Sequence, residues 1–285
     1  MTDELPPFLR IEAALRHFAT TTGTQDQGHI RPLHKYLALR LVIEGGYAPE
    51  EVTPRPPLRY ESRPGADLLI FDASQETSSE QTIIGGLKSK DVDVSVNKHT
   101  VGPVICVSVK GSGKAFRNLT NRMEEIIGDC ANLHMMYPGL IYGFFNVLKA
   151  NRPGEPNIQP NDVSVRTDNT VTPAIERWHN YLSEISGRKM IHDDVTRYES
   201  AALLLTETSP ANAGQIFASF PLPTSPLSVE QFFRTIYELY DLRFAYKASM
   251  KLGRLVWSEK SPALTELSNA FGPDLNVALG YSPRI

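Results

Sequence analysis

The sequence predicts an α/β fold with a mixed central β-sheet flanked by helices. Residues 91–96 alternate polar and apolar side chains, which is the period of a strand with one buried face. Residues 114–134 carry apolar side chains at helical spacing. Residues 140–148 form a nearly continuous apolar run, which is typical of a central strand buried on both faces. Strands and helices that alternate in this way favour an α/β domain.

The composition is that of a globular protein. Its 285 residues suit one α/β domain, 41% of them are hydrophobic and 21% are charged, so wholesale disorder is excluded. The net charge of -3 argues against a general polycation but is compatible with a local basic groove. The two cysteines, Cys106 and Cys130, are too few for a disulfide framework or a four-cysteine zinc site.

No apolar run reaches the roughly 18 residues of a membrane helix, and the first residues lack the basic and apolar regions of a secretory signal. We therefore expect a protein of a reducing cytoplasm that does not contact membranes.

The elements before the central region are two helices, a connection, a strand and a loop. Apolar spacing predicts helices over residues 8–20 and 34–44, the second ending at a Gly-Gly pair. Four prolines predict an extended connection over residues 49–57. A short buried strand is expected at residues 68–71 and a polar surface loop at residues 73–81.

A hairpin, a helix and a strand follow. The turn at residues 97–103 joins the strand at residues 91–96 to a second strand at residues 104–110, which predicts an antiparallel hairpin. From residue 68 to residue 148 the expected order is strand, strand, strand, helix, strand. In the second half we expect helices at residues 173–185 and 228–249, whereas residues 201–205 suit either a strand or a helix end.

Acidic and basic side chains converge in this hairpin. Asp91 and Asp93 share one face of the first strand, and Ser108 and Lys110 share one face of the second. This combination suits phosphodiester hydrolysis, because a carboxylate holds a divalent metal while a lysine stabilises developing charge or orients a water molecule. A second carboxylate is available from the next helix, where Glu124 and Glu125 follow Lys110 by 14 and 15 residues.

Asp93, Ser108-Val109-Lys110 and Glu124, within this order of elements, resemble the PD-(D/E)xK nuclease superfamily, and in particular the type II restriction endonucleases that cut CCGG-containing sites. In that branch a serine replaces the middle acid and a helix supplies the displaced carboxylate. The resemblance covers about residues 35–150. It implies a restriction-endonuclease-like core with helical N-terminal and C-terminal elaborations, in a single nuclease domain over residues 1–285. The expected catalytic set is Asp93, Lys110, Glu124 and Ser108, with Asp93 and Glu124 as metal ligands.

One departure from the family pattern leaves the first aspartate open. Lys90-Asp91 stands where the family has Pro-Asp, with Asp93 two residues further on. We prefer Asp93, which is deeper in the strand, and keep Asp91 as the alternative. The competing interpretation is that Asp91, Asp93 and Lys110 are solvated residues of an edge hairpin.

The helix after the hairpin carries polar and basic side chains at spacings of three and four residues, which places them on one face: Lys114, Arg117, Asn118, Asn121 and Arg122. Arginine and asparagine make bidentate contacts with guanine and adenine edges in the major groove. Residues 88–122 contain seven basic residues and two acidic ones, which favours phosphate binding. An ordinary solvated helix face is the alternative.

These patterns predict a sequence-specific, Mg²⁺-dependent endonuclease that acts on double-stranded DNA and restricts foreign DNA in a bacterial cytoplasm. Cutting both strands usually requires two active sites, so a homodimer or higher homo-oligomer is expected. The alternatives are a repair, junction-resolving or modification-dependent nuclease of the same fold, and a non-catalytic DNA-binding subunit. Cys130 and His134 are metal-ligand types four residues apart, but two ligands are too few, and we expect both in the core.

Overall fold

A computed structural model of the chain describes residues 5–21, 27–245 and 252–285. Its centre is a five-stranded sheet with the order β1-β6-β7-β8-β9. The strands are β1 (Val52–Thr53), β6 (Val94–Lys98), β7 (Gly102–Ser112), β8 (Ile141–Lys149) and β9 (Ser200–Thr206). β6 runs antiparallel to both β1 and β7, whereas β7, β8 and β9 run parallel. The predicted mixed sheet is confirmed.

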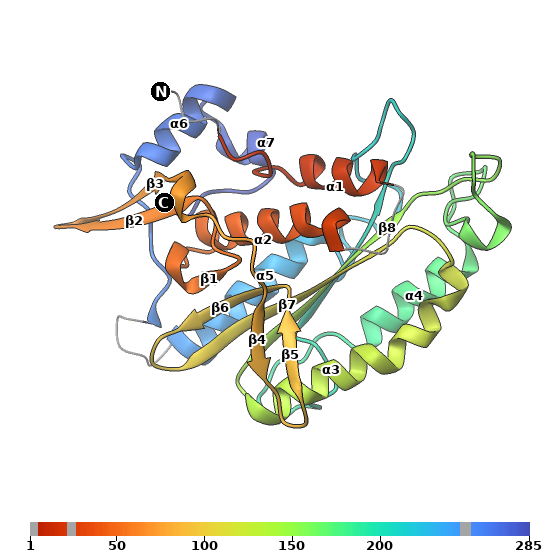
Figure 1. Cartoon of the computed structure of the whole chain (residues 1–285), viewed down its shortest axis with the longest axis horizontal. Helices are drawn as coiled ribbons and strands as arrows, with labels where there is room; N and C mark the ends of the chain where they lie inside the picture. Colours follow the sequence, from red (N-terminus) through yellow and green to blue (C-terminus); the bar gives the residue numbers. More distant parts are fainter. Residues whose placement is uncertain (1–4, 22–26, 246–251) are drawn as a thin grey trace.

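Helices cover both faces of this sheet (Figure 1). One face is covered by α2 (Arg31–Ile43) and α5 (Val229–Tyr240), and α1 (Ile11–Thr20) packs on α2. The other face is covered by α3 (Arg122–Met136) and α4 (Pro173–Glu184). Two short helices, α6 (Pro262–Phe271) and α7 (Leu275–Leu279), lie beyond α2. The predicted α/β arrangement of a sheet between helices is therefore confirmed.

Alternating side chains of the strands pack into two apolar layers, one on each face of the sheet. Val94, Val96, Val107 and Val109 pack towards α2 and α5, whereas Cys106 packs towards α3. The apolar run at residues 140–148 becomes β8, whose side chains are buried along almost its whole length because helices lie on both sides. Cys130 and His134 are buried, as expected for core residues.

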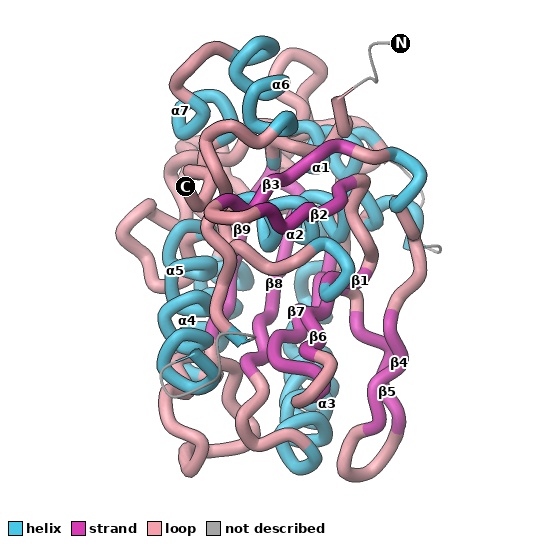
Figure 2. Tube along the Cα trace, turned by 90° about the vertical axis from the view of Figure 1, so that its left-hand side faces the viewer, coloured by secondary structure: helices cyan, strands magenta, loops and turns pink. Residues whose placement is uncertain are grey.

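Two hairpins stand outside the central sheet (Figure 2). They are β2–β3 (Leu58–Arg63 and Ala66–Phe71) and β4–β5 (Gln81–Ile84 and Ser89–Val92). The strand predicted at residues 68–71 exists as part of β3, but it pairs with β2 and not with the central sheet. The single strand predicted at residues 91–96 is wrong, because the chain bends at Asp93 and divides it into β5 and β6.

The helix predicted from residue 114 begins later. Ala115 has a φ of 56°, in the left-handed region that ends regular helix, and residues 116–121 form a 3-10 helix before α3 starts at Arg122. A 3-10 helix has about three residues per turn, so spacings of three and four no longer define one face. The continuous helix predicted from residue 114 is therefore wrong: Lys114 precedes the 3-10 helix that contains Asn118, and Arg122 begins α3.

The second half of the chain completes the sheet, so the core is not confined to residues 35–150. Residues 200–206 form the strand β9, which resolves the open choice between strand and helix end. The helix predicted at residues 173–185 is α4, and the one predicted from residue 228 is α5, which continues as a π-helical turn over residues 241–245. Residues 246–249 of that prediction lie outside the described residues. Within the described ranges, no helix has the length and apolarity needed to span a bilayer.

Candidate active site

Asp93 occupies the bend between β5 and β6, directly beside β7. Val94 pairs with Val107, so Asp93 faces Ser108 across the antiparallel ladder. Its side chain is 8% exposed. The Val109 N–H donates to Asp93 Oδ2 at 2.7 Å, and Ser108 Oγ lies 3.5 Å from the same oxygen. One carboxylate oxygen is therefore fixed by the sheet, while Oδ1 makes no hydrogen bond among the described residues.

Lys110 follows on the same face of β7, two residues after Ser108. Its carbonyl oxygen accepts a hydrogen bond from Asn146 Nδ2 at 2.8 Å, and Asn146 Oδ1 accepts one from Trp178 Nε1 at 2.8 Å. This buried chain of hydrogen bonds fixes the backbone of Lys110 against β8. Among the described residues, no hydrogen bond or ion pair engages the Lys110 ammonium group, which makes it available to a ligand.

Asp91 lies apart from Asp93. It belongs to β5, is exposed, and its Oδ1 accepts a hydrogen bond from Thr82 Oγ1 of β4 at 2.6 Å. The expectation that the two aspartates share one strand face is wrong, since the bend at Asp93 separates them. The placement of Asp93 beside Ser108 and Val109 agrees with the preference for this aspartate.

The carboxylates of α3 are arranged differently from the sequence expectation. Glu124 is exposed and lines neither cavity next to Lys110. Glu125 lines a crevice together with Ser108 and Lys110, with a free volume of about 10 Å³, roughly the room for one water molecule. Asp129 in the same crevice is paired with Lys90. Of the two adjacent glutamates, Glu125 is the one beside Lys110.

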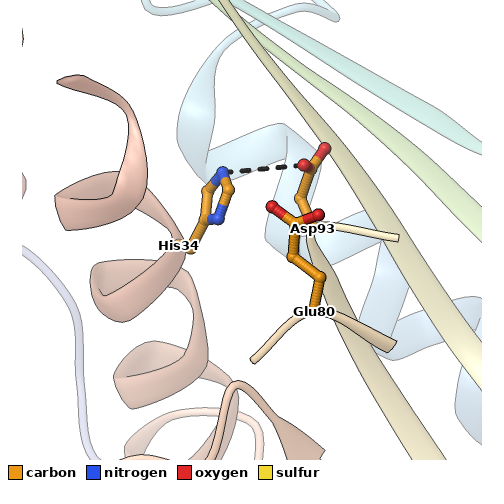
Figure 3. Close-up of side chains that lie close together, drawn as sticks. All are labelled: His34, Glu80 and Asp93. Carbon is orange, nitrogen blue, oxygen red and sulfur yellow. Dashed lines mark ion pairs between the residues drawn. The ribbon is translucent and has the colours of Figure 1, made fainter. Parts of the chain in front are cut away.

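Two side chains that the sequence did not single out complete the surroundings of Asp93. His34 of α2 points towards Asp93, and Glu80 approaches from the segment before β4 (Figure 3). His34 Nε2 lies 3.8 Å from Asp93 Oδ1, and one potential metal-binding atom of each of the three residues lies within 4.8 Å of the others. The only feature of the sequence that could have indicated His34 is its polar side chain in a helix rich in apolar residues. Glu80 had none, because it lies in a stretch predicted to be surface loop.

The electrostatics of this group reflect its burial. Burial lowers the pKa of His34, against the opposing effect of Asp93 and with a smaller contribution from Lys110 in the same direction. Burial also raises the pKa of Glu80, and the nearby charges of Asp93 and Asp91 add to that effect. A neutral imidazole and closely spaced carboxylates are the conditions under which a cation binds.

A cavity of about 940 Å³ opens at the carboxyl ends of β7 and β8. Asp93 and Lys110 lie on its wall. Further cationic side chains line it, namely Lys114, Arg122 and Lys149, and Glu155 is the other carboxylate. Ligands of α/β proteins commonly bind outside the carboxyl ends of the strands. The charge and position of this cavity suit a phosphate-bearing ligand.

The residues predicted to contact DNA are only partly described. Lys114 is exposed at the cavity and its Nζ donates to the Asn157 carbonyl oxygen at 2.7 Å. Arg122 is exposed and lines both the cavity and the crevice, and Asn118 is exposed. The side chains of Arg117 and Asn121 lie outside the described part of the structure, so their predicted roles are neither supported nor contradicted.

Comparison with known proteins gives no relative: no protein-family model, no curated protein and no solved structure matches this chain.

Proposed function

We propose that this protein is a sequence-specific, metal-dependent endonuclease of double-stranded DNA with a restriction-endonuclease-like core. The observation that carries the proposal is the juxtaposition of Asp93 and Lys110 at the wall of a basic cavity. The Asp93 carboxylate is held by the Val109 N–H on one oxygen only, and the Lys110 ammonium group has no partner among the described residues. A carboxylate and a lysine beside a basic cavity are the groups that phosphodiester hydrolysis uses.

In this proposal Asp93 binds a divalent cation, for which Mg²⁺ is the expected occupant. A bound cation supplies Lewis-acid polarisation of the scissile phosphate. Lys110 stabilises the negative charge that develops on the phosphate oxygens and orients the attacking water molecule. Asn146 acts as a positioning residue, because it fixes the Lys110 backbone through a buried hydrogen bond.

The α3 carboxylate of the predicted set is assigned by comparing two neighbouring glutamates. Glu124 has the spacing that the family resemblance implies, whereas Glu125 lines the crevice that contains Ser108 and Lys110. Glu124→Gln and Glu125→Gln therefore form a matched pair, with one charge removed one residue apart. Loss of cleavage in the first variant alone supports the predicted metal ligand Glu124, and loss in the second alone assigns the role to Glu125.

DNA binding is proposed to use the cationic wall of the cavity. Lys114, Arg122 and Lys149 line the same cavity as Asp93 and Lys110, and cationic side chains are the groups that bind a phosphate backbone. Lys149 Nζ also donates to the carbonyl oxygens of Ala19 and Thr21. A symmetric homodimer or a higher homo-oligomer would place two such sites on the two strands of a duplex. The expected biological setting is the restriction of foreign DNA in a bacterial cytoplasm.

The test is incubation of the full chain with plasmid DNA and Mg²⁺, followed by sequencing of the fragment ends. Fragments with a common end sequence, absent when a chelator is present, are the expected result. A panel of modified, branched and damaged duplexes run in parallel distinguishes a modification-dependent, junction-resolving or repair nuclease. Specific binding without cleavage of any substrate would instead indicate a non-catalytic DNA-binding subunit.

A further inference from the structure

We propose that His34, Glu80 and Asp93 form a cation site with one nitrogen and two oxygen ligands, and that this site prefers Mn²⁺-like cations to Mg²⁺. The three ligands come from α2, from the segment before β4 and from the bend before β6 (Figure 3). The inference deepens the function proposed above and rests on it for its role in catalysis. The cation site itself is testable by binding alone.

The first observation is an unsatisfied polar atom. His34 is 3% exposed, and its Nε2 has no hydrogen-bond partner among the residues that the structure describes. A buried imidazole nitrogen without a partner costs free energy and calls for a physical explanation. Nε2 points towards the two carboxylates, as Figure 3 shows, so a cation between them would supply the missing interaction.

The second observation is the spacing. His34 Nε2 and Asp93 Oδ1 are 3.8 Å apart, which is too long for a hydrogen bond. Two ligand atoms that each lie about 2.1 Å from one cation are at most about 4.2 Å apart. The observed separation therefore fits two atoms on either side of a cation. Glu80 also offers one potential ligand atom within 4.8 Å of a potential ligand atom of each of the other two residues.

The third observation is a small cavity at this place. It holds about 10 Å³ of free volume, and its lining includes His34, Glu80, Asp93, Ser78 and Ser79. This volume suits a single ion and not a larger ligand. Two cationic side chains also line it. Lys35 is paired with Glu76 at 3.0 Å, which leaves Arg31 as the competitor for the carboxylates.

The ligand types determine the expected selectivity. Oxygen ligands alone suit Mg²⁺ and Ca²⁺, whereas an imidazole nitrogen favours first-row transition cations. A site with one histidine and two carboxylates is therefore expected to bind Mn²⁺ more tightly than Mg²⁺. His34 is the residue that sets this preference, and Glu80 adds an oxygen ligand that the sequence analysis did not single out.

The experiment is calorimetric titration of the full chain with Mn²⁺ and, separately, with Mg²⁺. Wild type is expected to bind one Mn²⁺ per chain, more tightly than Mg²⁺. His34→Asn should weaken Mn²⁺ binding by at least about tenfold and reduce the preference over Mg²⁺. Glu80→Gln, on a partly exposed segment, should also weaken it and serves as the second variant if His34→Asn does not fold. Glu176→Gln, on the exposed face of α4, is the matched control that should bind as wild type does.

Three results would overturn the inference. The first is a folded wild type that binds no Mn²⁺. The second is a folded His34→Asn variant with wild-type affinity and selectivity. The third is Mn²⁺ binding that appears only in Arg31→Gln, which would show that the arginine neutralises the carboxylates. The nuclease proposal fails separately. If Mn²⁺ binding depends on His34 but no DNA is cleaved, the cation site is supported and the nuclease proposal is wrong. If Mg²⁺ supports cleavage equally well without His34, the nuclease proposal is supported and the role of His34 is wrong.

Discussion

Two buried carboxylates, Glu199 and Asp93, differ in how their charges are neutralised. Asp93 lies beside β7, and Glu199 directly precedes β9. Glu199 Oε1 accepts hydrogen bonds from Arg188 and Arg243 at 2.6 and 2.7 Å. Its Oε2 accepts the Tyr142 N–H at 2.8 Å and lies 3.2 Å from His134 Nε2. Both oxygens of Glu199 therefore have two partners.

Asp93 is neutralised far less completely. Its Oδ2 accepts the Val109 N–H at 2.7 Å, while its Oδ1 faces His34 Nε2 at 3.8 Å without a hydrogen bond. It also lines two cavities. Buried polar groups are normally satisfied, so an incompletely satisfied carboxylate beside open space indicates a binding site. The comparison separates a fully paired carboxylate, Glu199, from the incompletely paired one that we propose as a metal ligand, Asp93.

The largest expected effect is on DNA cleavage, when Lys110 beside Asp93 is removed. Lys110→Ala should abolish plasmid cleavage, because no other described cation is held by β7 beside Asp93, while binding to cognate DNA is retained. The side chain is half-buried at a cavity wall, so the fold should tolerate its loss. A purified Lys110→Ala variant that cuts at the wild-type rate would show that the catalytic assignment is wrong.

The next largest effect is on the free energy of unfolding, when the charge of Glu199 is removed. Glu199→Gln leaves Arg188 and Arg243 without a countercharge in the interior, which is expected to cost about 3–5 kcal/mol of unfolding free energy. Urea unfolding measures it, with Glu176→Gln on the exposed face of α4 as the matched control. A loss under about 1 kcal/mol, the range of surface ion pairs, would remove the contrast between the two carboxylates.

A smaller effect is expected in DNA discrimination. Arg117→Ala should lose roughly 1–3 kcal/mol of preference for the cognate sequence, because a guanidinium makes two hydrogen bonds with guanine. Lys114→Ala should weaken binding to all sequences alike and reduce the salt dependence by about one phosphate contact. Titrations on cognate and scrambled duplexes at several salt concentrations separate the two. Equal losses on both duplexes for Arg117→Ala would make it a backbone contact.

The smallest effect is the pH dependence of stability at Glu199. Burial alone would raise the pKa of this carboxyl group, but His134, Arg243 and the Tyr142 N–H outweigh burial and lower it below the ordinary value of 4.5. Because the folded-state pKa is depressed, the stabilising contribution is present above pH 4.5 and is lost as the pH falls through the folded-state value. The difference in unfolding free energy between wild type and Glu199→Gln should therefore shrink in acid. A difference that grows below pH 4.5 would contradict this sign.

The parts of the fold that local patterns specify were predictable. β7 corresponds to the second strand of the predicted hairpin, α3 follows from helical spacing and β8 from a continuous apolar run, and their order is as predicted. The bend at Asp93 was not predictable, because the alternation of residues 91–96 continues through it and only the pairing of β5 with β4 reveals the break. Ala115 hides a second break, since nothing in its side chain signals a left-handed backbone.

The candidate site was predictable only where its residues lie on one hairpin. Asp93, Ser108 and Lys110 are brought together by a short antiparallel connection, and the structure places them side by side. His34 and Glu80 reach Asp93 through the packing of α2 and the position of β4. Such contacts depend on tertiary structure, which a single sequence does not specify. Which of Glu124 and Glu125 lines the crevice beside Lys110 likewise depends on where α3 begins.

The most direct test of the account compares Asp93→Asn with Asp91→Asn, two substitutions that remove the same charge two residues apart. Both variants are measured for plasmid cleavage with Mg²⁺ or Mn²⁺ and for urea unfolding. We expect Asp93→Asn to lose cleavage and to keep its unfolding free energy within about 1 kcal/mol of wild type, because an asparagine oxygen still accepts the Val109 N–H. Asp91→Asn should cut normally. An active Asp93→Asn variant, or an inactive Asp91→Asn variant beside it, would contradict the assignment of Asp93 as the catalytic carboxylate.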